Sequence, residues 1–500
     1  MCLRRALLLS ALLAPAVVAD VTYFRESSSP SSSPPASPVT GRLEEHQSGV
    51  GGLCDAEVVQ RSGYFHVDAP NKTNEHYFYW MFESRVAPAA EQPFVLWLTG
   101  GPGCSGMLAL LAENGPCKIE GGADGSLTPV NNTHSWTNAA NVLWLDQPTG
   151  VGFSYGDAGD YDHDEAGVRD DVYHFLLAFF EAHPQYAKSD FFVFGESYGG
   201  HYAPNVAYRI WQGNGAHDEA KRAMAAGAAG AADAAIAAPS LKINLAGVAV
   251  GNGLTDPAAQ YPLYPAMAMN NTYGVKAVSE ADYVAMQAEL PACVAQIHAC
   301  NAGGRSGSDK QACIEAQGAC NNAQIGPYEE AGLNPYDVRI KCEIPGLCYN
   351  FSAPTQWLQQ PAVRAALGVT SASAAWATCN MGVNQAFAAD WMASQAYTVP
   401  PLLAAGVDVL VYAGDADFIC NWMGNKAWAR ALDWPGKAGF DGAADHDWKV
   451  AGVKAGTART AASGGSLTFL QVNDGGHMVP MDQPVNSLQM VKTFTTGGSF

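Results

Sequence analysis

Basic residues and long apolar runs are both scarce in this chain. Its 500 residues include 27 lysines and arginines against 47 aspartates and glutamates, a formal net charge of −20. Such an excess of acidic side chains argues against nucleic acids and anionic membranes as partners. No apolar run reaches the roughly 18 residues that cross a bilayer, so we expect no membrane span. The hydrophobic content of 48% is ample for a globular core.

The N-terminus carries the pattern of a secretory signal. Two arginines precede the apolar stretch 6–18, and a small-residue cleavage site follows, so residues 1–19 read as a signal peptide. The segment 20–50 is rich in Ser and Pro, which predicts a pro-segment or disordered linker with order beginning near Cys54. Secretory passage predicts a vacuolar, lysosomal or secreted protein. We expect this protein to be a monomer or a homodimer. Four N-glycosylation sequons fit that route and begin at Asn71, Asn131, Asn270 and Asn350.

Twelve cysteines on an oxidising route predict a disulfide framework. Cys2 leaves with the signal peptide, so eleven remain and at least one thiol should be free. Six form a dense cluster suited to stapling a loop-rich insertion: Cys293, Cys300, Cys313, Cys320, Cys342 and Cys348. The cluster lacks the C-x-x-C spacing of zinc ligands, so we expect no zinc there. We expect no cofactor elsewhere in the chain.

Short apolar runs alternate with helical patterns, notably a helical pattern over 165–182. Six runs read as buried strands: 94–98, 142–145, 191–194, 245–250, 407–412 and 467–472. This alternation predicts a largely parallel α/β sheet. Aromatic-rich alternation over 58–67 and 77–83 predicts a hairpin that leads into the sheet.

One long stretch separates two of the predicted core strands and holds most of the cysteines. We assign residues 256–395 to an inserted, disulfide-rich lid over the carboxyl ends of the strands, the usual ligand side of such sheets. Residues 51–255 and 396–500 then make up the α/β core.

An apolar strand runs directly into Gly195-Glu196-Ser197-Tyr198-Gly199, and a helix-compatible stretch follows. This is the arrangement of a nucleophile elbow, whose sharp turn exposes the serine hydroxyl. A serine nucleophile needs a base, and the base needs a carboxylate to orient it. His477 follows one predicted strand, and both Asp415 and Asp417 follow another. The order Ser, Asp, His is that of an α/β-hydrolase fold, but these residues alone leave the choice of aspartate open.

Acyl transfer also requires backbone donors for an oxyanion. The N–H of Tyr198, directly after the serine, is one candidate. The glycine loop 100–103, which follows the run 94–98, offers a second, because glycine lets the backbone approach a substrate closely.

The chain resembles the serine carboxypeptidase family. The resemblance spans roughly residues 54–500 and rests on seven segments: 97–105, 145–155, 195–202, 251–257, 320–324, 412–428 and 475–480. It implies a catalytic triad of Ser197, Asp417 and His477, in which the second aspartate is chosen over Asp415. It also implies Gly101 and Tyr198 as the oxyanion donors.

The resemblance further implies a network that binds the C-terminal carboxylate of a peptide. Its members are Trp97, the backbone of Gly100, Glu113 and Glu196. A carboxyl group beside a bound carboxylate must be protonated to donate a hydrogen bond, so exopeptidase activity should favour acidic pH. Where the family usually has Asn, this chain has Thr99, whose hydroxyl can still donate one hydrogen bond.

Matching context in the family implies four disulfides: Cys104–Cys379, Cys293–Cys320, Cys300–Cys313 and Cys342–Cys348. Cys54 and Cys117 have no match among the bonds that the resemblance implies and could pair with each other, which leaves Cys420 as the free thiol. Matching positions imply an apolar pocket for the penultimate residue, lined by Tyr198, Leu254, Tyr261, Tyr264, Trp391, Ile419 and Cys420. Leu108 and Met478 imply an apolar pocket for the leaving residue.

We therefore predict a broad-specificity serine carboxypeptidase that acts on peptide and protein C-termini and favours hydrophobic residues. An acyltransferase would form the same acyl-enzyme, but Glu196 argues against it, since similar acyltransferases tend to carry Asp there. A protective binding partner is the non-enzymatic alternative. The stretch 160–164 begins like a calcium loop but has Glu165 where the loop needs Gly, so we expect a solvated acidic turn and no metal.

Overall fold

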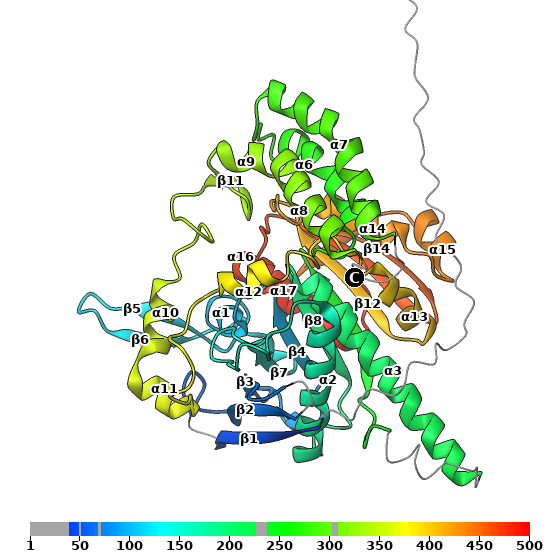
Figure 1. The fold of residues 1–500 in the computed structure, drawn as a ribbon. Helices are drawn as coiled ribbons and strands as arrows, with labels where there is room; N and C mark the ends of the chain where they lie inside the picture. Colours follow the sequence, from blue (N-terminus) through cyan, green and yellow to red (C-terminus); the bar gives the residue numbers. More distant parts are fainter. Residues whose placement is uncertain (1–39, 50–51, 69–71, 227–237, 303–308) are drawn as a thin grey trace, which may run out of the picture. The chain divides into compact units, whose positions relative to one another are not determined.

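Six parallel strands form the centre of a mixed eleven-stranded sheet. In spatial order they are β7 (Asn141–Leu145), β4 (Phe94–Thr99), β8 (Phe191–Glu196), β9 (Leu245–Gly251), β12 (Asp408–Gly414) and β15 (Gly465–Val472). Each predicted apolar run lies in one of them. The prediction of a mostly parallel α/β-hydrolase sheet is confirmed, and Figure 1 shows it with its helices.

The computed structural model describes residues 40–49, 52–68, 72–226, 238–302 and 309–500. The predicted signal peptide 1–19, most of the segment 20–50 and Asn71 lie outside the described residues. Within the described part, no helix has the length and apolar character needed to cross a membrane.

Antiparallel strands extend both edges of the sheet. On one edge lie β3 (His76–Phe82), β2 (Gln60–Asp68) and β1 (Thr40–Gly49), and on the other lie β14 (Val453–Ser463) and β13 (His446–Val450). The predicted hairpin corresponds to β2 and β3. Two small sheets pair β5 (Cys117–Gly121) with β6 (Leu127–Asn131) and β10 (Leu333–Asn334) with β11 (Asp337–Lys341).

Strand β1 corrects one expectation, because residues 40–49, which precede Cys54, form a strand paired with β2. Its polar composition concealed the alternation of a strand. Leu43 packs against the core, and the Glu45 carboxylate accepts from Arg61 at 2.8 Å and lies 3.0 Å from His183. Inward-facing groups therefore anchor a strand that composition alone assigned to a disordered linker.

Helices cover both faces of the sheet. One buried cluster includes residues of α2 (Glu165–Ala182), α3 (Gly199–Ala225), α13 (Val399–Ala404), α14 (Trp422–Ala431) and α15 (Lys437–Gly442). The other includes residues of α1 (Gly106–Ala112), α10 (Ser352–Gln359), α11 (Pro361–Leu367), α16 (Val479–Asp482) and α17 (Pro484–Thr495). The bounds of α2 are those of the predicted helical pattern.

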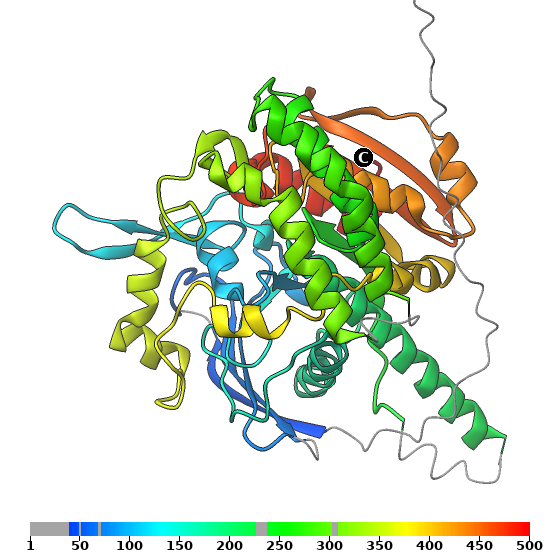
Figure 2. The ribbon, with the colours of Figure 1, turned by 45° about the horizontal axis from the view of Figure 1, so that its top comes forward.

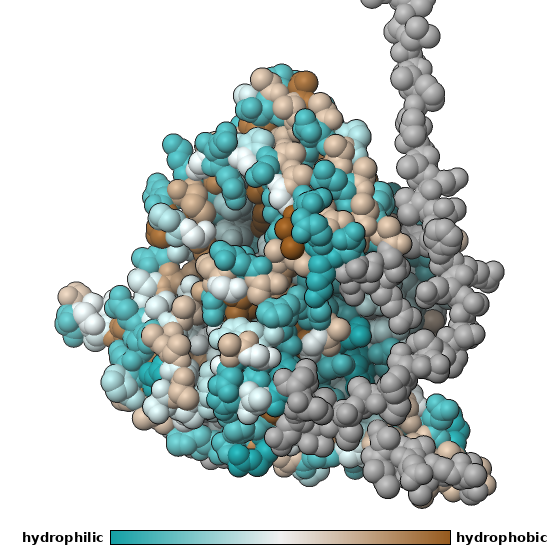
Figure 3. Space-filling view, viewed as in Figure 1, coloured by the Kyte–Doolittle hydropathy of each residue, from teal (hydrophilic) through white to brown (hydrophobic). Residues whose placement is uncertain are grey.

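The segment 256–395 is mainly helical, and its helices lie in two places. Near its start come α5 (Pro257–Gln260), α6 (Tyr264–Asn270), α7 (Glu280–Cys300), α8 (Lys310–Gln324) and α9 (Gly326–Glu330). Helices α6 to α9 gather together, away from α10 and α11, as both ribbon views show (Figures 1 and 2). The short α12 (Met381–Ala386) follows. On the face drawn in Figure 3, strongly apolar residues lie singly or in small groups among hydrophilic ones.

Five disulfides join the described cysteines, and Cys420 is free and buried. Two of them link α7 to α8. The five pairs are those expected from the sequence: Cys54–Cys117, Cys104–Cys379, Cys293–Cys320, Cys300–Cys313 and Cys342–Cys348. The first of them is the pair that the family resemblance did not imply.

Candidate active site

Ser197 stands at a sharp turn between β8 and α3. Its backbone has φ of +63°, a left-handed conformation that a non-glycine residue adopts only under constraint. A Cβ on Gly195 would lie 2.2 Å from the Gly199 carbonyl oxygen, so the turn cannot close around a side chain there. The strand–turn–helix geometry of a nucleophile elbow is present.

His477 and Asp417 meet at the carboxyl ends of the strands. The imidazole Nδ1 of His477 lies 2.8 Å from Asp417 Oδ2, and both side chains are almost fully buried. The Asp417 carboxylate also accepts from the backbone N–H groups of Ile419 and Cys420, both at 3.1 Å. Several donors thus hold the carboxylate in place.

Asp415, the other candidate carboxylate, has different partners. It accepts from the Tyr273 hydroxyl and from the Asp474 N–H, the latter at 2.9 Å. These bonds tie its loop to the segment before His477 and to the inserted segment 256–395. Of the two aspartates, only Asp417 has a hydrogen bond to His477 among the described residues.

Asn252 was not assigned a role from the sequence, yet it connects the serine strand to the aspartate loop. Ser197 N–H donates to the Gly251 carbonyl at 3.1 Å, and the next side chain, Asn252, donates Nδ2–H to Asp417 Oδ2 at 2.8 Å. Its Oδ1 accepts from Gly414 N–H at 2.9 Å. The signal available in the sequence was a polar residue between two glycines at the end of a buried strand.

The β10–β11 hairpin was also missed, and it braces both loops. The Pro335 carbonyl accepts from the N–H groups of Phe418 and Ile419 at 3.1 and 2.9 Å, and the Tyr336 carbonyl accepts from His477 N–H at 2.8 Å. The Tyr336 ring centroid lies 5.1 Å from that of the imidazole. Nothing local in the sequence marks these contacts, because they depend on where the inserted segment returns.

The two predicted oxyanion donors lie on adjoining turns. A Cβ on Gly100 would be 2.3 Å from the Tyr198 nitrogen and 2.8 Å from the Ser197 Cβ, so the glycine loop packs directly against the elbow. Gly101 has φ of +110°. Within the described residues, neither the Gly101 nor the Tyr198 N–H donates to another group.

Glu113 and Glu196 form a buried carboxyl pair beside this site. Burial raises the pKa of Glu113 to about 7, and burial together with the neighbouring Glu113 charge raises the pKa of Glu196 well above its ordinary value. At acidic pH both carboxyls are therefore protonated and able to donate hydrogen bonds. The Trp97 indole N–H donates to Thr99 Oγ at 2.9 Å, and Thr99 pairs in register with Glu196 across β4 and β8.

Most of the predicted pocket residues for the penultimate side chain are in contact. The ring centroids of Tyr198 and Trp391 lie 5.5 Å apart and those of Tyr261 and Tyr264 lie 5.0 Å apart. Trp391 Nε1–H donates to the Tyr261 hydroxyl at 3.2 Å, and the Tyr264 hydroxyl donates to the Ile419 carbonyl at 2.6 Å. The remaining predicted pocket residues are buried, and the first two belong to the same buried cluster as the three tyrosines: Leu254, Cys420, Leu108 and Met478.

Burial raises the pKa of the Cys420 thiol well above its usual range, and the Asp417 charge adds to the effect. The thiol therefore stays protonated and unreactive.

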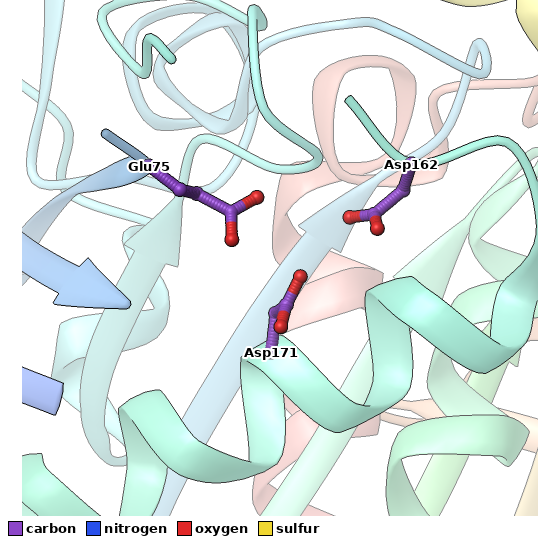
Figure 4. A group of neighbouring side chains, drawn as sticks. All are labelled: Glu75, Asp162 and Asp171. Atoms are coloured by element: carbon purple, nitrogen blue, oxygen red, sulfur yellow. The ribbon is translucent and has the colours of Figure 1, made fainter. Parts of the chain in front are cut away.

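Three carboxylates, Glu75, Asp162 and Asp171, converge beside α2, as Figure 4 shows. Lys72 Nζ lies 2.9, 3.0 and 2.9 Å from them, so an ammonium group already fills the place that a cation would take. The expectation of a solvated turn is wrong, because Asp160 and Asp162 are buried and Asp160 accepts from the N–H groups of Thr73 and Asn74. The acidic stretch is a structural ion cluster.

Three predicted glycosylation residues can be located, and all are exposed: Asn131, Asn270 and Asn350.

The comparisons with known proteins agree with this geometry. The family model described as serine carboxypeptidase matches residues 53–497. Serine carboxypeptidase 3 of Oryza sativa subsp. japonica is 39% identical over 91% of this chain and 83% of its own length, and carboxypeptidase Y homolog A of Chaetomium globosum is 41% identical over 92% and 77%. The crystal structure of Kex1(delta)p, a prohormone-processing carboxypeptidase from Saccharomyces cerevisiae, superposes with a TM-score of 0.72 at 25% identity and covers 88% of this chain and 92% of its own. This chain belongs to the serine carboxypeptidase family.

Proposed function

We propose that Ser197 is the nucleophile of this serine-type carboxypeptidase, His477 its general base and Asp417 the carboxylate that orients the base. The observation that carries the proposal is the buried 2.8 Å contact between His477 Nδ1 and Asp417 Oδ2. With Nδ1–H bonded to Asp417, Nε2 is left as the basic nitrogen.

In the first step, Ser197 Oγ gives its proton to His477 Nε2 and attacks the carbonyl carbon of the last peptide bond. The N–H groups of Gly101 and Tyr198 stabilise the negative charge that develops on the carbonyl oxygen. His477 then returns the proton to the leaving amine, and the C-terminal residue departs. Water, deprotonated by His477, hydrolyses the acyl-enzyme and restores Ser197.

Recognition of the free C-terminal carboxylate is assigned to Glu113, Glu196 and the Gly100 N–H, with Thr99 and Trp97 beside them. The raised pKa values of both glutamates support this assignment, since only protonated carboxyls can donate to a carboxylate. Activity on peptides should therefore be greatest at acidic pH.

The proposed specificity is broad and favours hydrophobic residues on both sides of the cleaved bond. Its support is the apolar character of the pocket side chains, most of which are buried, with Trp391 and Ile419 partly buried. The segment 256–395 contributes Tyr261, Tyr264 and Trp391 to this pocket, and we propose that it serves as a lid over the site. Five disulfides and exposed sequons support a vacuolar, lysosomal or secreted location.

Incubation of the purified full chain with the blocked dipeptide Z-Phe-Leu between pH 4 and 8 tests the proposal. Leucine release should be strongest at low pH and should fall by about 10⁴-fold or more in Ser197→Ala. Asp417→Asn and Asp415→Asn form a matched pair on one loop. The first should lose about 10⁴-fold in kcat, because an amide holds the wrong histidine tautomer, whereas the second should keep most of its activity. Equal losses in the two variants would overturn the assignment of Asp417.

A further inference from the structure

Tyr198 takes part in the proposed site twice, through its backbone N–H and through its ring. The side chain is 2% exposed. Its ring stacks on His201 at 4.3 Å between centroids and meets Trp391 at 5.5 Å and Tyr202 at 5.3 Å. Tyr198 therefore supplies both a wall of the acyl-side pocket and the backbone that carries the proposed oxyanion donor.

Among the residues that the structure describes, a single side-chain hydrogen bond holds the Tyr198 hydroxyl. It donates to Asp390 Oδ2 at 2.8 Å, and Asp390 is 3% exposed. Asp390 directly precedes Trp391 in the segment 256–395. One buried bond thus joins the nucleophile elbow to the segment that supplies the neighbouring Trp391 ring.

The surroundings of Asp390 also contain a second buried carboxyl that the proposed mechanism does not use. Glu165, at the start of α2, is 2% exposed, and neither of its carboxyl oxygens has a hydrogen-bond partner among the described residues. Burial raises the pKa of Asp390 to about 7; burial and the Asp390 charge raise that of Glu165 well above its ordinary value. At acidic pH both are neutral, and the Asp390 carboxyl can still accept from the Tyr198 hydroxyl.

We propose that Asp390 is a positioning residue that, by holding the Tyr198 hydroxyl, fixes the acyl-side pocket for large penultimate side chains. The inference rests on the proposed function. A large side chain must press against the Tyr198 ring, so it needs the ring held, whereas glycine at the same position does not reach the ring. Loss of the bond should therefore lower kcat/KM selectively for substrates with a large penultimate residue.

The test measures kcat and KM for Z-Phe-Leu and Z-Gly-Leu on the full chain carrying Asp390→Leu, Asp390→Asn or Tyr198→Phe. Leucine is similar in size to aspartate but accepts no hydrogen bond, so Asp390→Leu should reduce the preference for Phe over Gly by about tenfold. Asp390→Asn keeps an acceptor and should rescue most of that preference. Tyr198→Phe removes only the hydroxyl and should reproduce the loss; added to Asp390→Leu, it should cause no further loss.

Tyr202→Phe is the matched control, since Tyr202 is a buried tyrosine on the same helix whose hydroxyl lacks a side-chain partner among the described residues. It should leave the Phe-to-Gly preference unchanged. The inference would be overturned if Tyr198→Phe kept the Phe-to-Gly preference, or if kcat/KM fell equally for both substrates. If Asp390→Leu does not fold, Tyr198→Phe alone decides the question. An unmutated protein that releases no leucine would instead contradict the proposed function.

Discussion

The side chain of Asn252 bridges Asp417 and the end of β12. Its Nδ2–H donates to Asp417 Oδ2 at 2.8 Å, the same oxygen that contacts His477, and its Oδ1 accepts from Gly414 N–H at 2.9 Å. Asn252 has φ of +39°, a backbone conformation that asparagine adopts more readily than most residues. One amide therefore fixes the carboxylate relative to the strand on which its loop begins.

We predict that Asn252→Gly lowers kcat for Z-Phe-Leu by about tenfold, with KM nearly unchanged, because a less firmly held carboxylate orients His477 less well. Glycine tolerates the positive φ, so backbone strain is avoided. Asn252→Ala should show a similar loss of kcat together with a larger loss of stability. Steady-state kinetics of both variants check this prediction, and a rise in KM without a fall in kcat would contradict it.

The pH dependence of peptide hydrolysis should follow the Glu113 and Glu196 pair. Both pKa values are raised, that of Glu113 to about 7, so the protonated, donating form of Glu113 prevails at lower pH and is lost as pH rises through about 7. We expect kcat/KM for Z-Phe-Leu to fall over that range. An ester of Z-Phe has no terminal carboxylate and should not show this fall.

Glu113→Gln provides the control for this pH effect, because an amide donates at every pH. The variant should lose activity at pH 5 but should show a flatter decline toward pH 8. A parallel decline of ester and peptide hydrolysis in the unmutated protein would exclude carboxylate recognition as its cause.

The fold was predictable because its signals are local. Continuous apolar runs gave all six parallel strands, and Gly-x-Ser-x-Gly after one of them gave the turn at Ser197. The position of His477 after a strand is equally local. Strand β1 was missed because several of its alternating positions carry charged side chains, so no apolar alternation shows in the sequence. Strands β13 and β14 were missed because they form an antiparallel extension with little apolar character.

Contacts between distant segments were not predictable from the residues themselves. Asp415 and Asp417 are equivalent in sequence, and what separates them is Tyr273, which lies 142 residues before Asp415 and occupies its carboxylate. The acidic stretch 160–164 was predicted to be solvated because its ion-pair partner Lys72 lies 90 residues before Asp162, so no local pattern reveals the pairing. Such pairings depend on the order of the strands in the sheet, which the local pattern leaves undetermined.

The buried ion cluster should make the fold less stable at alkaline pH. Burial and the charges of Asp162 and Glu75 raise the pKa of Asp171 to about 9, and burial and Asp162 raise that of Glu75 to about 7. Above pH 4, Asp171 and Glu75 therefore hold more protons in the folded chain than in the unfolded chain. The free energy of unfolding consequently falls as pH rises toward 9. Asp171→Asn should reduce the fall in the unfolding midpoint between pH 5 and 9 by about 3 °C.

Asp157→Asn is the matched control for that measurement, because Asp157 lies on the same acidic loop but is exposed. Its unfolding midpoint should depend on pH as in the unmutated protein. If the two variants respond alike, the cluster is not the source of the pH dependence. Thermal unfolding followed by tryptophan fluorescence suffices for the comparison.

Thr99 offers the most direct test of how the terminal carboxylate is bound. Its buried hydroxyl already accepts from the Trp97 indole at 2.9 Å, which leaves one O–H donor. Asparagine would accept the same bond and offer two N–H donors, so Thr99→Asn should lower KM for Z-Phe-Leu about fivefold, the worth of one added hydrogen bond. Thr99→Val has no donor and should raise KM. Both variants should hydrolyse an ester of Z-Phe as the unmutated protein does, since that substrate presents no carboxylate. A KM that moves in the same direction in both variants would place the carboxylate out of reach of residue 99.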